Sequence, residues 1–334
     1  MNLPKRTNLS REIIKRQDVI DFLNSNKPLN YLFDMPFNLP LARIELYKRT
    51  YFGIGNTECY KINLKNNNQL YLKMEYLNSM GNTHYSRFWL IYLFLCEAFG
   101  IISPNKTKIL EVTSGSSGIA LARAANIFQY FTTIIVPNIL PQTRTSPMNN
   151  KYVNVISVPG YIPECIDKLR VLNKETIYFA TNHSEEKSDT IIKVFSRIAH
   201  EIINEHIDPD YSIIALGNGT STLAIAKTLK LHNPNTQVWT YKPDFERKPD
   251  DIVFGLIVPN IDFRHLKPAL SYVDKVLFTT GVDLSEIKNY FQFDTEISNL
   301  GFSSLYGIYF AIDLAKSVQE KKILTLGYDK IDRY

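Results

Sequence analysis

A run of small residues interrupts an apolar stretch near the middle of the chain. It consists of Gly217, Asn218, Gly219, Thr220 and Ser221. The surrounding SIIALGNGTSTLAIAKTLK reads as a buried strand that opens directly into a helix. Such a junction aims backbone N–H groups at an anion near the positive end of the helix dipole. We therefore predict a phosphate-binding loop, with a glycine turn and a Ser/Thr helix cap as the alternative.

Two more junctions of small residues precede predicted helices. In ILEVTSGSSGIALARAAN a strand runs into Thr113, Ser114, Gly115, Ser116 and Ser117, whose amides and hydroxyls suit a carboxylate. The third junction, GFSS, lies before a predicted helix over residues 305–316. There Ser303 offers a hydroxyl to a ring nitrogen, unless the segment is only a helix cap.

The elements that must position these loops follow an alternating pattern. Short β-rich runs, each followed by a helical or loop segment, are KILEVT, TTIIVP, NVISV, TIYFA, YSIIAL, WTYKP, DIVFGLIV and KVLFTT. The pattern predicts an α/β fold with mostly parallel sheets covered by helices. Ahead of it we expect a helix over residues 10–24 in an arm and a hairpin within residues 44–74. Ligands of such sheets bind beyond the carboxyl ends of the strands, so the three loops should share one site.

Composition excludes several classes of function. The 334 residues are 45% apolar and 21% charged, which is typical of globular proteins. The net charge of +5 is dispersed, so nucleic acid is not an expected partner. Three cysteines without CxxC spacing, and histidines without ligand spacing, predict neither disulfides nor a metal site. The longest apolar run, residues 88–96, is too short to span a membrane, and we expect a cytoplasmic protein.

Five landmarks resemble the cysteine synthase and tryptophan synthase β-chain family, the fold-type II enzymes that use pyridoxal phosphate. The family reads LKxExxNPxGSxKDR, ExTSGNTGIALA, GTGGT, GISSGA and DxGxRY. This chain has LKMEYLNSMGNTHYSR, EVTSGSSGIALA, GNGTS, GFSSLY and YDKIDRY in the same order. The resemblance implies two lobes, each with a mostly parallel sheet. It implies an N-terminal arm over residues 1–39, a larger lobe over 40–80 plus 179–334, and a smaller lobe over 81–178.

The same resemblance implies roles for the three loops. The cofactor phosphate would lie on residues 217–221 and its pyridine nitrogen would face Ser303. Residues 113–117 would hold a substrate carboxylate, with Ser116 where the family has an asparagine beside the cofactor ring. Thr220 replaces a family glycine. A bulky residue in place of Gly219 should block the phosphate and leave the fold intact.

The family lysine that binds the cofactor as an imine has no counterpart in the landmark segment. Alignment on Arg87 puts Tyr85 at that position, and counting from Glu75 puts His84 there. Neither side chain forms an imine, so pyridoxal phosphate would be held non-covalently. Both are candidate catalytic acids or bases, His84 near neutral pH and Tyr85 only if its pKa falls; the alternative is an aromatic pair at the lobe interface.

These observations lead to one main hypothesis about function. We expect an enzyme of the cysteine synthase type that acts at the β-carbon of a small serine-like amino acid and, by resemblance, forms a homodimer. The alternatives are a non-catalytic binding or regulatory relative, and an enzyme that binds another phosphorylated ligand. Whether a lysine such as Lys73 or Lys61 reaches the pocket distinguishes them.

Overall fold

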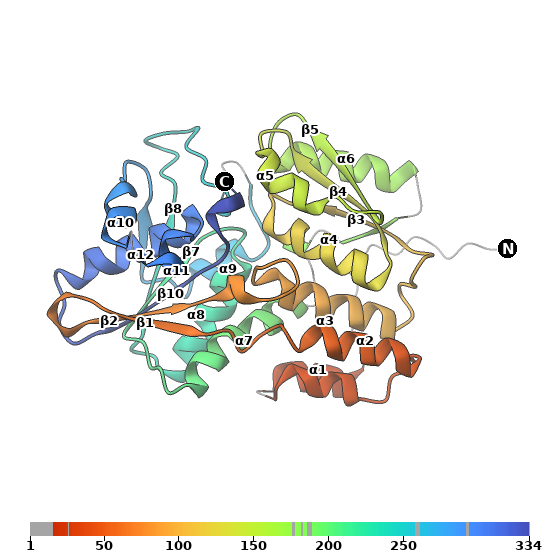
Figure 1. Ribbon diagram of the computed structural model, residues 1–334, viewed down its shortest axis with the longest axis horizontal. Helices are drawn as coiled ribbons and strands as arrows, with labels where there is room; N and C mark the ends of the chain where they lie inside the picture. The colour runs from red at the N-terminus through yellow and green to blue at the C-terminus, as the bar shows by residue number, and fades with distance from the viewer. Residues whose placement is uncertain are drawn as a thin grey trace.

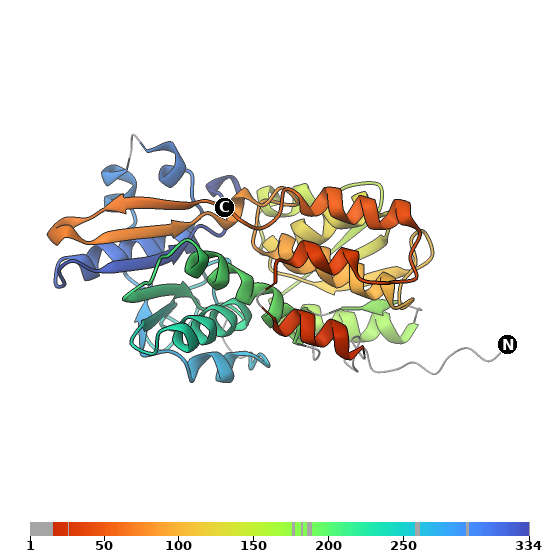
Figure 2. The same ribbon diagram turned by 90° about the horizontal axis from the view of Figure 1, so that it is seen from below.

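The computed structural model describes residues 16–25, 27–175, 178–181, 183–185, 189–257, 261–291 and 294–333. Figure 1 shows two halves, each built on its own sheet with helices on both faces, and Figure 2 shows the same halves from below. This α/β architecture is the one predicted from the alternating pattern. No helix in the described ranges is both long and apolar enough to cross a membrane.

The larger sheet has six strands in the order β1-β2-β10-β7-β8-β9. Its strands are β1 (Cys59–Asn63), β2 (Gln69–Lys73), β7 (Tyr211–Ala215), β8 (Gln237–Lys242), β9 (Lys275–Phe278) and β10 (Lys322–Leu326). Strand β1 is antiparallel to β2, and all other pairs are parallel. The helices of this half are α7 (Thr190–Asn204), α8 (Thr220–His232), α9 (Leu266–Leu270), α10 (Ser285–Tyr290), α11 (Thr295–Ser298) and α12 (Phe302–Ala315).

The smaller sheet has four parallel strands in the order β5-β4-β3-β6. They are β3 (Lys108–Val112), β4 (Phe131–Pro137), β5 (Val153–Val158) and β6 (Phe179–Ala180). With this half lie α1 (Gln17–Asn24), α2 (Leu41–Tyr51), α3 (Tyr85–Ala98), α4 (Ser116–Phe128), α5 (Gln142–Thr145) and α6 (Ile162–Glu175). The predicted lobe boundaries remain predictions.

Helix α3 is the central packing element of the molecule. Its residues 86–97 are all buried, as expected for a helix that is apolar on every side. The only acid among them, Glu97, accepts hydrogen bonds from Tyr47 at 2.8 Å and Tyr130 at 2.6 Å, and pairs with Arg43 at 2.6 Å. These contacts join α2, α3 and the strand after α4, so a buried carboxylate fixes how the helices meet.

A second buried group of charges holds the segment that leads into α3. Arg87 donates to both oxygens of Glu75 at 2.7 Å, and to Glu201 on α7 at 2.5 and 2.8 Å. Lys73 lies 3.0 Å from the same Glu201. Arg87, on α3, therefore holds both Glu75 and Glu201 of the larger half, and these contacts fix the segment between Glu75 and Arg87 that carries His84 and Tyr85.

Three local predictions need correction. Residues 44–51 belong to helix α2, and only β1 and β2 form the predicted hairpin; Arg43 and Tyr47 both reach Glu97 because they are one helical turn apart. The predicted helix over 10–24 begins, in the described residues, at Gln17; residue 10 lies outside them. Residues 251–257 form no strand: of this run only Val253 and Leu256 are buried, and Gly255 and Leu256 line the cleft described next.

Candidate functional site

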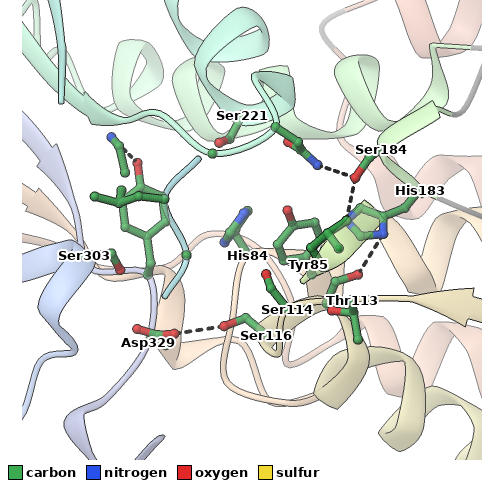
Figure 3. Close-up of a pocket in the computed structure, with 18 of the residues that line it drawn as sticks. His84, Tyr85, Thr113, Ser114, Ser116, His183, Ser184, Ser221, Ser303 and Asp329 are labelled. Carbon is green, nitrogen blue, oxygen red and sulfur yellow. Dashed lines mark hydrogen bonds between the residues drawn. The ribbon is translucent and has the colours of Figure 1, made fainter. Parts of the chain in front are cut away.

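Residues of all three predicted loops line one cleft. It is lined by His84, Tyr85, Thr113, Ser114, Ser116, Ser117, Gly217, Asn218, Ser221 and Ser303, which are predicted site residues, and by residues from both halves around them. Figure 3 shows the loop of Ser221 across the cleft from Ser114 and Ser116, with His84 and Tyr85 between them. Gly115, Gly219 and Thr220 were also predicted but are not among the lining residues.

The glycine loop takes its shape from two backbone requirements. Gly219 precedes α8 with φ of +86°, in the left-handed region that favours glycine. A Cβ there would lie 2.7 Å from the backbone of His265, and one on Gly217 would lie 3.1 Å from the carbonyl of Gly255. The first turn of α8 has N–H groups without intrahelical acceptors, so the loop can bind an anion.

Within this loop the side chains face different ways. Thr220 donates to Asn218 Oδ1 from its backbone N–H at 3.1 Å and from its hydroxyl at 2.5 Å. The Thr220 hydroxyl therefore stabilises the turn, whereas Ser221 lines the cleft.

The loop after β3 is held by Thr113 and by an arginine from the next helical segment. Thr113 Oγ1 accepts the N–H groups of Gly115 and Gly118 at 3.1 Å each. Arg144 Nε donates to the carbonyl of Ser114 at 3.0 Å and covers Gly115, where φ is +136° and a Cβ would lie 2.1 Å from that nitrogen. The Thr113 hydroxyl is thus engaged within the loop, and Ser114 and Ser116 face the cleft.

A polar network closes the end of the cleft nearest residue 329. Ser116 donates to Asp329 Oδ2 at 2.8 Å, and Arg144 lies 3.5 Å from the same oxygen. Ser303, 3% exposed, begins α12 nearby, and its carbonyl accepts the Tyr241 hydroxyl at 2.5 Å. Arg144 and Asp329 were missed from the sequence, although YDKIDRY had marked the segment of Asp329.

The two candidate catalytic residues form a packed pair. The rings of His84 and Tyr85 lie 4.2 Å apart, and Phe195 on α7 contacts both, at 5.0 and 5.6 Å. Burial lowers the pKa of His84 to about 4 and raises the pKa of Tyr85 above its ordinary value. Burial therefore makes His84 a weak base near neutral pH in this geometry, and its catalytic role stays a prediction.

No lysine lines the cleft in the part of the chain that the structure describes. Lys73 is fully buried and donates to the Thr57 carbonyl at 2.5 Å besides pairing with Glu201. Lys61 lies over the ring of Tyr71 on the β1–β2 hairpin. Neither of the two lysines considered from the sequence supplies an amine to the cleft.

His183, which was not among the predicted site residues, is 6% exposed and lines the cleft. Its Nδ1 lies 3.0 Å from the carboxylate of Glu111, and Ser184 beside it accepts from Asn218 Nδ2 at 2.9 Å. The sequence signal was present but weak: a polar cluster directly after a strand, with an acid inside the neighbouring strand β3.

Comparison with known proteins agrees with this geometry. The pyridoxal-phosphate dependent enzyme family matches residues 50–276. A cysteine synthase from Flavobacterium sp. is 28% identical over 57% of this chain and 63% of its own length. Rat cystathionine beta-synthase is 29% identical over 47% of this chain and 25% of its own. A hydrogen sulfide-producing enzyme from Fusobacterium nucleatum has a TM-score of 0.76 at 26% identity, covering 85% of this chain and 97% of that one.

The chain therefore belongs to the family of pyridoxal-phosphate dependent enzymes, with the fold-type II architecture. It spans less than two thirds of the length of the curated relatives it matches. Membership implies pyridoxal phosphate as the cofactor. The glycine loop fits its phosphate because Gly217, Asn218 and Ser221 line the cleft where the first turn of α8 has N–H groups without intrahelical acceptors. The described lining residues include no lysine amine that could form an imine. The cleft therefore fits pyridoxal phosphate only as a non-covalently bound ligand.

Proposed function

We propose that this chain binds pyridoxal phosphate without a covalent bond and acts, like cysteine synthase, at the β-carbon of a small serine-like amino acid. When bound, the cofactor supplies an electron-withdrawing ring that stabilises negative charge on the substrate. Residues 217–221 would hold its phosphate, Ser303 its ring nitrogen and Ser116 its ring hydroxyl. The amides and hydroxyls of residues 113–117 would orient the substrate carboxylate.

The observation that carries this proposal is the shared cleft. Gly217, Asn218 and Ser221 of one half face Ser114 and Ser116 of the other across a single cavity. An anion-binding loop and a carboxylate-binding loop on opposite sides of one cleft suit a phosphorylated cofactor and an amino acid bound side by side. Gly255 and Leu256 also line the cleft and would help to exclude water from that pair.

The proposal is tested by mixing the purified protein with pyridoxal phosphate and following absorbance. Binding should saturate, reverse on dialysis, and leave no phosphopyridoxyl adduct on a pocket lysine after borohydride reduction. A specific adduct on one pocket lysine would overturn non-covalent binding. Turnover is then measured with serine and O-acylated serine in the presence of sulfide.

A non-catalytic relative is the second candidate, and a specific observation favours it. The two residues at the family lysine position are packed against Phe195, one as a neutral imidazole and the other as a neutral phenol. A binding or regulatory subunit needs the cradle but no proton acceptor. Reversible cofactor binding without turnover or α-hydrogen exchange for any amino acid supplied would favour this candidate.

A further inference from the structure

A histidine lines the cleft on the side of the smaller half, and a buried acid lies behind it. Glu111 on β3 is fully buried, and its Oε1 lies 3.0 Å from His183 Nδ1. The carboxylate also accepts the backbone N–H of His183 at 3.3 Å and the hydroxyl of Thr181. Both the ring and the backbone of His183 are thus fixed by one side chain that has no other part in the site.

This contact determines the tautomer of the histidine. A carboxylate accepts hydrogen bonds, so the hydrogen of the imidazole lies on Nδ1 and the lone pair on Nε2. Nε2 lies 3.5 Å from Ser184 Oγ, which also receives the hydrogen bond from Asn218 of the glycine loop. On the other side, Ser117 of the carboxylate loop lies 3.4 Å from Nδ1. His183 therefore stands between the loop assigned to the cofactor and the loop assigned to the substrate (Figure 3).

The second histidine of the cleft lacks this arrangement. His84 has Thr83 Oγ1 at 3.4 Å from Nδ1 and aromatic rings around it. Burial lowers the pKa of His84, and the charge of the nearby Glu75 offsets this only in part. A base that works near neutral pH needs a partner that stabilises the imidazolium, and only His183 of the two has one in direct contact.

We propose that His183, oriented by Glu111, is the general base that takes a proton from the amino acid held on residues 113–117. The α C–H bond breaks, the proton goes to Nε2 and the electron pair stays with the substrate; the imidazolium returns the proton in the reverse step. Glu111 is a positioning residue that stabilises the charge on His183. This inference rests on the proposed function, because it requires an amino-acid substrate in the cleft.

The first test reads the tautomer directly and needs neither cofactor nor substrate. Protein labelled with ¹⁵N-histidine, with His183 assigned from the loss of its signals in H183Q, should show hydrogen on Nδ1 and a bare Nε2. A hydrogen on Nε2 would overturn the proposal. The E111L variant should lose this preference; an unchanged spectrum there would show that Glu111 does not orient the ring.

The second test follows exchange of the α-hydrogen of L-serine in deuterated buffer, by proton NMR, with pyridoxal phosphate present. H183Q should slow exchange about 100-fold or more, the usual contribution of a positioned base. E111Q should slow it with little change in KM. H200Q, which alters a histidine on α7 outside the cleft, should stay near the wild-type rate.

Two results of the exchange test would overturn the proposal: wild-type rates in H183Q, or loss of exchange in H84Q with retention in H183Q. Absence of exchange in a wild-type protein that binds the cofactor would also overturn it. Failure of pyridoxal phosphate to bind would instead reject the proposed function, and the tautomer measurement still tests the pair in that case.

Discussion

Replacing Gly219 with alanine should lower the stability of the protein for two separate reasons. The first is the left-handed backbone, with φ of +86°. The second is space: the new Cβ would lie 2.7 Å from the carbonyl carbon and oxygen of His265 and from Leu266 Cα. These are backbone atoms at the start of α9, so the loop itself must move. The Cβ points toward α9, so a larger residue here disturbs the fold as well as the ligand, contrary to the expectation from sequence.

The expected loss of stability follows from those two costs. A non-glycine residue in the left-handed region costs about 1–2 kcal/mol. Overpacking against atoms that cannot rotate away adds about 1–3 kcal/mol. G219A should therefore lower the free energy of unfolding by about 2–5 kcal/mol.

Gly100 provides the matched control. Its φ is +69°, and a Cβ there meets nothing within 4 Å, so G100A carries the backbone cost without the clash. Urea unfolding of the cofactor-free proteins should show G219A destabilised more than G100A, by about 1–3 kcal/mol. Titration with pyridoxal phosphate should show weaker binding in G219A and unchanged binding in G100A. Equal destabilisation of the two variants would refute the predicted contact with α9, and unchanged affinity in G219A would place the phosphate elsewhere.

Further predictions concern charge and assembly. R87M leaves the fully buried Glu75 without its main partner and should cost about 3–5 kcal/mol in unfolding free energy; K321M, at an exposed pair, should change stability little, and equal losses would contradict the buried network. Burial raises the pKa of Glu201, but Arg87 outweighs it and lowers that pKa to about 2, below the ordinary 4.5. The stabilisation that ionised Glu201 gives should therefore be present above pH 4.5 and lost as the pH falls toward 2. In E201Q the free energy of unfolding should vary less with pH over that range. T220D removes the hydroxyl that donates to Asn218 and places a carboxylate at a fully buried position, so it should distort the loop and weaken pyridoxal phosphate binding in calorimetry, whereas T220S, which keeps that hydrogen bond, should not. Light scattering should return a dimer mass; a monomer mass over a wide concentration range would reject the homodimer.

The sequence predicts those parts of the site that depend on local chain geometry. A strand that ends in glycine and serine and then opens a helix has few alternatives, so the loops at 113–117 and 217–221 were predicted and occupy one cleft. Which side chains of these loops face the cleft was harder to predict. The orientation of Thr220 toward Asn218 depends on an Asx-type turn that the residue types permit but do not require.

The parts that were missed come from residues whose importance depends on tertiary contacts. Arg144 lies in a short helix, and its contacts with Ser114 and Asp329 join segments far apart in the chain. His183 was missed because its partner, Glu111, lies inside a strand some seventy residues earlier. The run 251–257 looked like a strand because an apolar loop beside a cleft and a strand in a sheet have similar compositions.

The position of β10 has a consequence for how the protein is made. This strand lies between β2 and β7 and pairs with both, although it is synthesised more than one hundred residues after β7. Until the ribosome has released residues 322–326, the β1–β2 hairpin has no neighbour in the sheet, and β2 and β7 present open edges. Tyr328 and Asp329, which follow directly, line the cleft. A nascent chain can fold the four-stranded sheet early, but the cofactor cleft cannot form before residues 322–329 have been synthesised, so open edges must be shielded in the interval.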